Sequence, residues 1–209
     1  MSEYVAPLAD MKFVIEHIAG LDQLRRIDGF SDATPELVDA ILEEAAKLAT
    51  EVLSPLNRVG DLEGSKLVGD SVQTPPGWRE AYTTFIEAGW ASLAGEPEFG
   101  GQGLPKLVAT AVSEMWNSAN LSFALCPMLT QGALDAIEHH AAQHFKELYV
   151  AKLISGEWTG TMNLTEPQAG SDLSAVRTKA VPEGDHYRIS GQKIFITYGE
   201  HDLTENIIH

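Results

Sequence analysis

The stretch of sequence that best defines the fold is MNLTEPQAGSD, residues 162–172. Its residue types predict a strand that ends in a turn, because Pro167 fixes φ and Gly170 permits a positive φ. Ser171 and Asp172 can accept hydrogen bonds from backbone N–H groups in such a turn. The turn would present backbone amides and hydroxyls at a sheet edge, where they could bind a planar ring. A plain strand and turn explains the same residues, so both interpretations stay open at this point.

Two further strands are predicted downstream of this stretch. HYRIS, residues 186–190, alternates polar and apolar residues with the period of a half-buried strand. Residues 191–192 indicate a turn into a second strand, KIFIT, residues 193–197. The last residues, 203–209, resemble the approach to another strand. Strands after residue 158 are too few to close a barrel, so we expect either a partner chain or, preferably, a fragment of a longer protein.

Upstream of about residue 156 the sequence is typical of helices. Thr34 and Pro35 predict an N-cap and first turn, and Pro55 is expected to end that helix. Between them the apolar residues recur at helical spacing: Leu37, Val38, Ile41, Leu42, Ala45, Leu48, Ala49, Val52 and Leu53. Shorter helices are expected at about 78–90, 105–119, 122–138 and 141–155, with Gly- and Pro-rich loops at 60–77 and 96–105. We therefore predict a helical domain, residues 1–156, and the start of a β domain, residues 157–209.

Composition excludes several classes of partner. The chain has 209 residues and a net charge of −16, from 30 acidic and 14 basic residues. Such an acidic surface repels phosphate backbones and anionic lipid, so we expect neither nucleic acid nor a membrane as a partner. The acidic start lacks the basic region of a signal peptide, and no apolar run is long enough for a membrane helix. We expect a cytoplasmic protein, in which the single Cys126 is a buried thiol.

Three generic motifs carry little weight. Residues 100–103, GGQG, are not the G-x-G-x-x-G fingerprint and are better interpreted as a flexible helix connection. His139, His140 and His144 include a pair at i, i+4 spacing, but the Glu of H-E-x-x-H is absent. We expect surface histidines and no metal site. The glycines of a nucleophile elbow are absent around the three serines considered, Ser113, Ser118 and Ser122.

Several motifs together resemble one family. TEPQAGSD (165–172), followed by SGQKIFIT (190–197), resembles the flavin-contacting stretch of acyl-CoA dehydrogenases. AVRTKA (175–180), between them, is similar to the same family. Upstream, PEFGGQGL (97–104) resembles the family's Pro-x-x-x-Gly-Gly-x-Gly loop, and ISGEW (154–158) the start of its β domain. The opening, residues 4–13, resembles the larger bacterial branch, which includes dehydrogenases of 3-methylmercaptopropionyl-CoA.

The resemblance implies both a fold and a reaction. The fold would be the amino-terminal helical bundle of an acyl-CoA dehydrogenase followed by the first strands of its middle β-barrel domain. A homo-oligomer, dimer or tetramer, would bind FAD near its subunit contacts. The reaction would be α,β-dehydrogenation of an acyl-CoA thioester. A carboxylate would remove the α proton, the β hydrogen would leave as hydride to flavin N5, and an electron-transfer flavoprotein would accept the electrons.

The resemblance also implies site residues in the first motif. Met162 and Leu164 would place backbone groups near the flavin, and Thr165 would bond the pyrimidine edge of its ring. Gly170 and Ser171 would lie along the cofactor and the acyl-CoA, with Ser171 the best candidate for a substrate contact.

The second motif would supply the other cofactor contacts, Phe195, Ile196 and Thr197. Phe195 stands where many relatives have Trp, so it would pack on the flavin face without an indole N–H. Thr197 would donate its hydroxyl toward N5. Donors at the pyrimidine edge and at N5 would stabilise the charge that reduction puts on the ring. A core strand or turn remains the alternative role for all these residues.

No catalytic residue is expected within this chain. In the family the catalytic base belongs to the carboxy-terminal helical domain, and Glu166 belongs to the flavin turn. We therefore expect the chain alone to be inactive. Two alternatives stay open: a truncated homologue that acts as a binding or assembly partner, and an oxidase of the acyl-CoA oxidase or nitroalkane-oxidising type.

Overall fold

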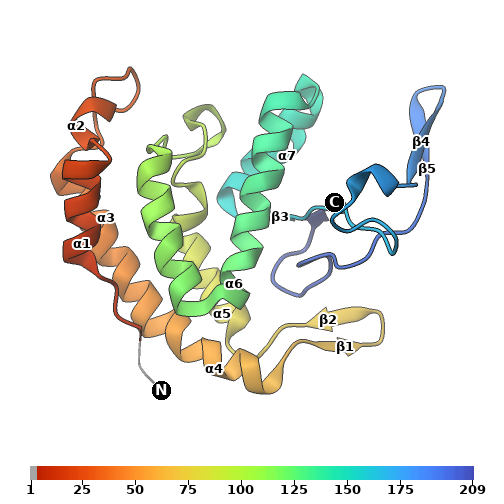
Figure 1. The fold of residues 1–209 in the computed structure, drawn as a ribbon, viewed down its shortest axis with the longest axis horizontal. Helices are drawn as coiled ribbons and strands as arrows, with labels where there is room; N and C mark the ends of the chain where they lie inside the picture. Colours follow the sequence, from red (N-terminus) through yellow and green to blue (C-terminus); the bar gives the residue numbers. More distant parts are fainter. Residues whose placement is uncertain (1–3) are drawn as a thin grey trace.

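The computed structural model describes residues 4–209 and contains a helical part followed by an extended part with short strands (Figure 1). The helices are α1 (Leu8–Phe13), α2 (Leu21–Leu24), α3 (Pro35–Lys47), α4 (Ser54–Glu63), α5 (Trp78–Glu87), α6 (Lys106–His140) and α7 (Gln143–Ser155). The strands are β1 (Lys66–Val68), β2 (Ser71–Gln73), β3 (Thr159–Gly160), β4 (Lys179–Glu183), β5 (His186–Ser190) and β6 (Ile207–Ile208). The mostly helical fold with a partial β domain is thus confirmed.

The start of α3 agrees with the sequence, but its continuation does not. The hydroxyl of Thr34 accepts a hydrogen bond from the N–H of Leu37 at 3.3 Å, and Pro35 occupies the first turn. Pro55 was expected to end this helix, and that prediction is wrong. The backbone stays helical through a wider π-helical stretch, Leu48–Leu53, into α4. Pro55 lies in the first turn of α4, and the wider turn before it gives room for a ring that would clash in a regular α-helix.

The helices expected at 105–119 and 122–138 form one element, α6, with a kink between them. At the kink Asn120 has φ −157° and ψ 86°, and its side chain is buried. Its Oδ1 accepts a hydrogen bond from the N–H of Phe123 at 3.1 Å, which caps the second half of the helix. Its Nδ2 donates to the carbonyl oxygen of Leu53 at 3.2 Å. One side chain therefore joins both halves of α6 to the π-helical stretch.

The main core lies between these helices and is rich in aromatic rings. Trp78, Phe85 and Phe123 are all buried, and the ring centroids of Phe85 and Phe123 lie 6.1 Å apart in an edge-to-face arrangement. Cys126 is buried in the same cluster, as expected. Burial raises the pKa of its thiol well above the usual range.

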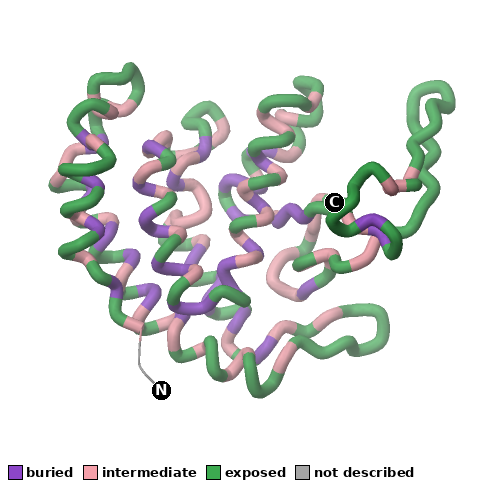
Figure 2. Tube along the Cα trace, viewed as in Figure 1, coloured by how far each residue is buried: buried purple, intermediate pink, exposed green. Residues whose placement is uncertain are grey.

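The extended part contains less regular structure than the sequence indicates. The β4–β5 hairpin forms as an antiparallel pair and is exposed along its whole length (Figure 2). Residues 193–197 were expected to form a strand, and this is wrong. Phe195 and Tyr198 have positive φ values of 57° and 53°, which interrupt the extended backbone that a strand needs. A hairpin, β1–β2, forms instead in the expected loop at 60–77.

Residues 162–172 also differ in part from the expectation. The preceding strand, β3, covers only Thr159–Gly160 and pairs in parallel with β6, and residues 161–165 are irregular. A turn does form, because Glu166 and Ala169 exchange two backbone hydrogen bonds, at 3.1 and 3.0 Å, but it does not use the positive φ that Gly170 permits.

A buried histidine supports the β3–β6 pair. His201 is 5% exposed, and its Nε2 lies 3.1 Å from the hydroxyl of Thr159. Its Nδ1 accepts a hydrogen bond from the N–H of Leu203 at 3.2 Å, so the ring is neutral in this arrangement. Burial lowers the pKa of His201, against the opposing influence of Glu200 and Asp202.

We expect Asn120→Ala to lower the free energy of unfolding by about 2 kcal/mol, because it removes a helix cap and the buried hydrogen bond to the carbonyl of Leu53. Asn117→Ala is the matched control, since the amide of Asn117 bonds only within its own helix turn, to Ser113. Asn117→Ala should lower the free energy of unfolding by clearly less than Asn120→Ala does. Urea unfolding of both variants tests this, and equal losses would contradict the capping role.

We also expect the protein to lose stability as the pH falls below about 6.5, the unfolded-state pKa of histidine. In the pH range between the lowered pKa of His201 in the folded protein and that value, the unfolded chain binds more protons than the folded chain. The free energy of unfolding therefore decreases as the pH decreases. His201→Gln should flatten this slope in urea titrations from about pH 7.5 to about pH 5.5. The same replacement at His186, exposed on β5, is the control for the loss of a surface histidine. An unchanged slope in His201→Gln would refute the assignment.

Candidate functional site

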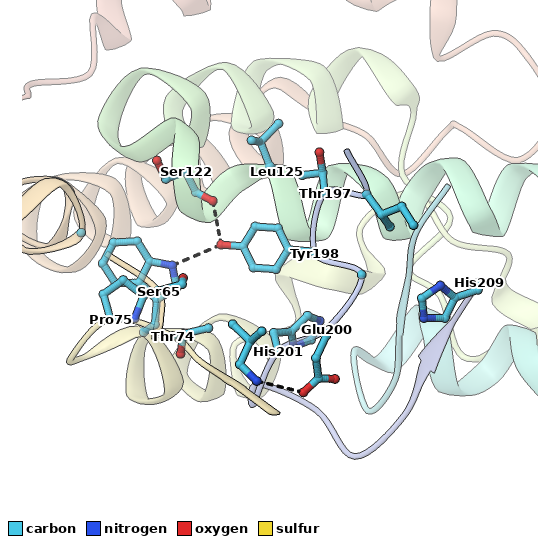
Figure 3. A pocket seen from close by; sticks show the side chains of 15 residues that line it. Ser65, Thr74, Pro75, Ser122, Leu125, Thr197, Tyr198, Glu200, His201 and His209 are labelled. Atoms are coloured by element: carbon cyan, nitrogen blue, oxygen red, sulfur yellow. Dashed lines mark hydrogen bonds between the residues drawn. The ribbon is translucent and has the colours of Figure 1, made fainter. Parts of the chain in front are cut away.

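A cleft of about 660 Å³ lies between the helical part and the loop at residues 196–201 (Figure 3). Its walls come from the end of α4, the β1–β2 hairpin, the start of α5 and the middle of α6. Two of the predicted cofactor residues, Ile196 and Thr197, line this cleft. The other six do not.

Tyr198 fixes one wall of the cleft to the helices. Its hydroxyl donates to the carbonyl oxygen of Ser122 at 2.7 Å and accepts a hydrogen bond from the indole N–H of Trp78 at 3.2 Å (Figure 3). Burial raises the pKa of this phenol above its usual range, so it stays protonated and able to donate. The loop that carries Thr197 is therefore attached to both α5 and α6.

A second attachment joins the same loop to the β1–β2 hairpin. Asp202 Oδ1 accepts from both the N–H and the hydroxyl of Thr74, at 3.0 and 2.7 Å. Glu200 Oε1 accepts from the N–H of Val72 at 3.2 Å. The opposite walls of the cleft are thus linked by direct hydrogen bonds.

The two sequence motifs, far apart in the chain, lie side by side. The N–H of Ile194 donates to the carbonyl oxygen of Thr165 at 3.0 Å. The hydroxyl of Thr161 donates to the carbonyl oxygen of Thr197 at 2.7 Å. Residues 161–165 and 194–197 therefore run next to each other, as a shared site needs.

The predicted cofactor residues on these segments are accessible. Phe195, Met162 and Leu164 have large apolar side chains that are 86%, 62% and 38% exposed. Gly170 and Ser171 are also exposed, and Thr165 is partly buried. An added Cβ at Gly170 would meet nothing within 4 Å, so space is open there. These exposed apolar groups beside hydroxyls and backbone amides suit a flat, partly apolar ligand, and the individual contacts remain predictions.

Glu166 makes contacts that the sequence did not reveal. Its side chain is 2% exposed and pairs with Lys193, whose Nζ lies 2.9 Å from Oε1. The backbone N–H of Thr178, the Lys193 ammonium and the backbone N–H of Arg177 hold the pKa of Glu166 far below its usual range. No local signal could reveal this, because the partners lie 11 to 27 residues away in the sequence.

A carboxylate held in this way is a poor proton acceptor. This agrees with the expectation that Glu166 belongs to the turn and does not act as the base. The histidines do not form the metal pair that their spacing allowed, because α6 ends at His140 and α7 begins at Gln143. Among residues 4–209, no cluster of three or more His, Cys, Asp or Glu side chains suits a metal ion. In the same part of the chain, no helix is long and apolar enough to cross a membrane.

The sequence is similar to known proteins over nearly its whole length. It is 49% identical over 207 residues to 3-methylmercaptopropionyl-CoA dehydrogenase of Ruegeria pomeroyi, and 38% identical over 212 residues to a butyryl-CoA dehydrogenase of Syntrophomonas wolfei. Each alignment covers 99% of this chain and 35% of the relative, so the chain spans about a third of the length of these relatives.

Solved structures show the same fold. Butyryl-CoA dehydrogenase of Megasphaera elsdenii superposes with a TM-score of 0.67 at 24% identity, over 78% of this chain and 41% of that one. A structure described for the electron transferring flavoprotein of Acidaminococcus fermentans matches with a TM-score of 0.66 at 29% identity, over 78% and 40%.

A family model settles the relationship. Residues 36–157, more than half of the chain, match the model described as acyl-CoA dehydrogenase, N-terminal domain. With the helical fold and the two adjacent motifs, this match shows that the chain belongs to the acyl-CoA dehydrogenase family.

Proposed function

We propose that this protein binds FAD and catalyses the α,β-dehydrogenation of an acyl-CoA thioester to the 2-enoyl-CoA. The observation that carries the proposal is the adjacency of residues 161–165 and 194–197, with the side chain of Phe195 exposed on the second segment. The family match supports the class of reaction.

Each site residue has a distinct role in this proposal. FAD, when bound, supplies the hydride acceptor. Thr165 binds the pyrimidine edge of its ring, the backbone groups of Met162 and Leu164 lie near the flavin, and Thr197 donates toward N5. Phe195 packs against the face of the ring, for which its exposed side chain leaves room. Ile196 supports this segment from the cleft.

Substrate contacts belong to the turn and to protein outside residues 1–209. Gly170 and Ser171 are exposed beside the turn, and Ser171 is the proposed contact to the acyl-CoA. We place the catalytic base outside these residues, because Glu166 is fully engaged by hydrogen-bond donors. Residues 1–209 alone are then expected to be inactive.

The relatives support the choice of substrate and electron acceptor in this proposal. The relatives at 49% and 38% identity are named for 3-methylmercaptopropionyl-CoA and butyryl-CoA, so we propose a short acyl-CoA. We propose an electron-transfer flavoprotein as electron acceptor, supported by the name of one similar structure. A homo-oligomer, dimer or tetramer, and a cytoplasmic location complete the proposal.

The first test is the absorption spectrum and intact mass of the purified full-length protein. We expect flavin absorption bands at about 370 and about 450 nm, which bleach when short acyl-CoA thioesters are added under anaerobic conditions. Turnover with electron-transfer flavoprotein, and little hydrogen peroxide in air, would separate a dehydrogenase from an oxidase. A flavin-free protein that binds another chain tightly would instead identify a non-catalytic partner and contradict the proposal.

Phe195→Ala should weaken FAD binding by about tenfold, since it removes the aromatic surface that packs on the ring. Tyr187→Ala is the matched control, because Tyr187 is also an exposed aromatic residue of the extended part but pairs with Pro182 within the β4–β5 hairpin. It should bind FAD as the wild type does. Flavin fluorescence titration measures both affinities, and equal affinities for all three proteins would remove Phe195 from the site.

A further inference from the structure

The carboxylate of Glu166 connects three separate segments of the extended part. Its Oε1 accepts from the N–H of Thr178 and from Lys193 Nζ, each at 2.9 Å. Its Oε2 accepts from the N–H of Arg177 at 2.8 Å and from Gln168 Nε2 at 2.6 Å. Four donors around one buried carboxylate leave it little freedom to rotate, so its orientation is fixed.

Lys193 connects Glu166 to the segments of the predicted flavin site. Besides its ion pair with Glu166, Lys193 Nζ donates to the carbonyl oxygen of Leu164 at 2.8 Å. The next residue, Ile194, donates its N–H to the carbonyl oxygen of Thr165. The ammonium group thus lies at the junction between residues 164–165 and 194–197.

The backbone at this junction needs such support. Phe195 adopts a left-handed conformation, with φ 57°, that is costly for a residue with a bulky side chain. Its side chain is 86% exposed, so packing of the ring within the chain does not hold it there. The hydrogen bonds of Lys193 and Ile194 fix the chain immediately before it.

We propose that Glu166 and Lys193 are positioning residues for the flavin. The pair sets the separation between Leu164–Thr165 and Phe195–Thr197, so that both segments contact the same ring. This inference rests on the proposed function, because it needs a flavin at these segments. It also implies that the positive charge beside the site is balanced, since Glu166 neutralises Lys193.

The test compares Glu166→Gln, Lys193→Met and the double variant in the full-length protein. Each single variant should weaken FAD binding by about tenfold, and the double variant by less than the product of the two losses. Glu183→Gln is the matched control. Glu183 also forms an ion pair in the extended part, but on the exposed β4–β5 hairpin. Its carboxylate accepts two hydrogen bonds from Arg188, each at 2.9 Å. It should bind FAD with wild-type affinity.

A second measurement separates positioning from a merely stabilising role. Glu166→Gln leaves a cation beside the ring and should raise the flavin reduction potential, whereas Lys193→Met leaves an anion and should lower it. Each tenfold change in the preference for the reduced flavin corresponds to about 30 mV for a two-electron couple. Shifts of the same sign, or none, would overturn the inference.

The remaining outcomes are also decisive. If the wild type binds FAD and both single variants bind it equally well, the inference fails and the proposed function stands. If the wild type binds no FAD, both fail. Should Glu166→Gln not fold, Gln168→Ala replaces it, because Gln168 is exposed and contributes one of the four donors. A several-fold loss of FAD affinity supports the inference, and unchanged affinity overturns it.

Discussion

The hydroxyl of Tyr198 is the contact on which the arrangement of the site depends. It bonds to α5 through Trp78 and to α6 through Ser122, so a loop of the extended part is attached to two helices at one atom. The helices are in turn held by Asn120, which bends α6 and bonds the stretch before α4. A change in either contact would move the cleft walls relative to the motifs. The position of the site is thus a property of the helical core as much as of the motifs.

Charge presents a second constraint. The chain carries a net charge of −16, yet the proposed cofactor and substrate are both phosphorylated anions. Long-range attraction therefore cannot recruit them, and local donors must do so. Near the two motifs, the one buried carboxylate, Glu166, is neutralised by Lys193 and by backbone N–H groups. Glu166 consequently adds no net negative charge beside the two motifs.

The sequence predicted those features that depend on local patterns. The N-cap at Thr34, the helix-rich first part, the turn at Glu166 and the buried Cys126 all follow from residues close together in the chain. The errors have non-local causes. Continuation past Pro55 depends on a π-helical stretch, and the break at Phe195 depends on a left-handed backbone that its apolar neighbours do not reveal. The Glu166–Lys193 pair could not be predicted either, because it joins residues 27 positions apart. The flavin contacts themselves were inferred from resemblance and remain predictions.

The burial of Cys126 has a practical consequence for studying motion in this protein. It is the single cysteine of the chain, it lies in the kinked helix α6, and its thiol is held in the unreactive protonated form. A thiol reagent can therefore modify the folded chain only when the helical core opens, since reaction needs an accessible thiolate. The rate at which the reagent modifies Cys126 then measures how often the core opens, and no engineered label is needed.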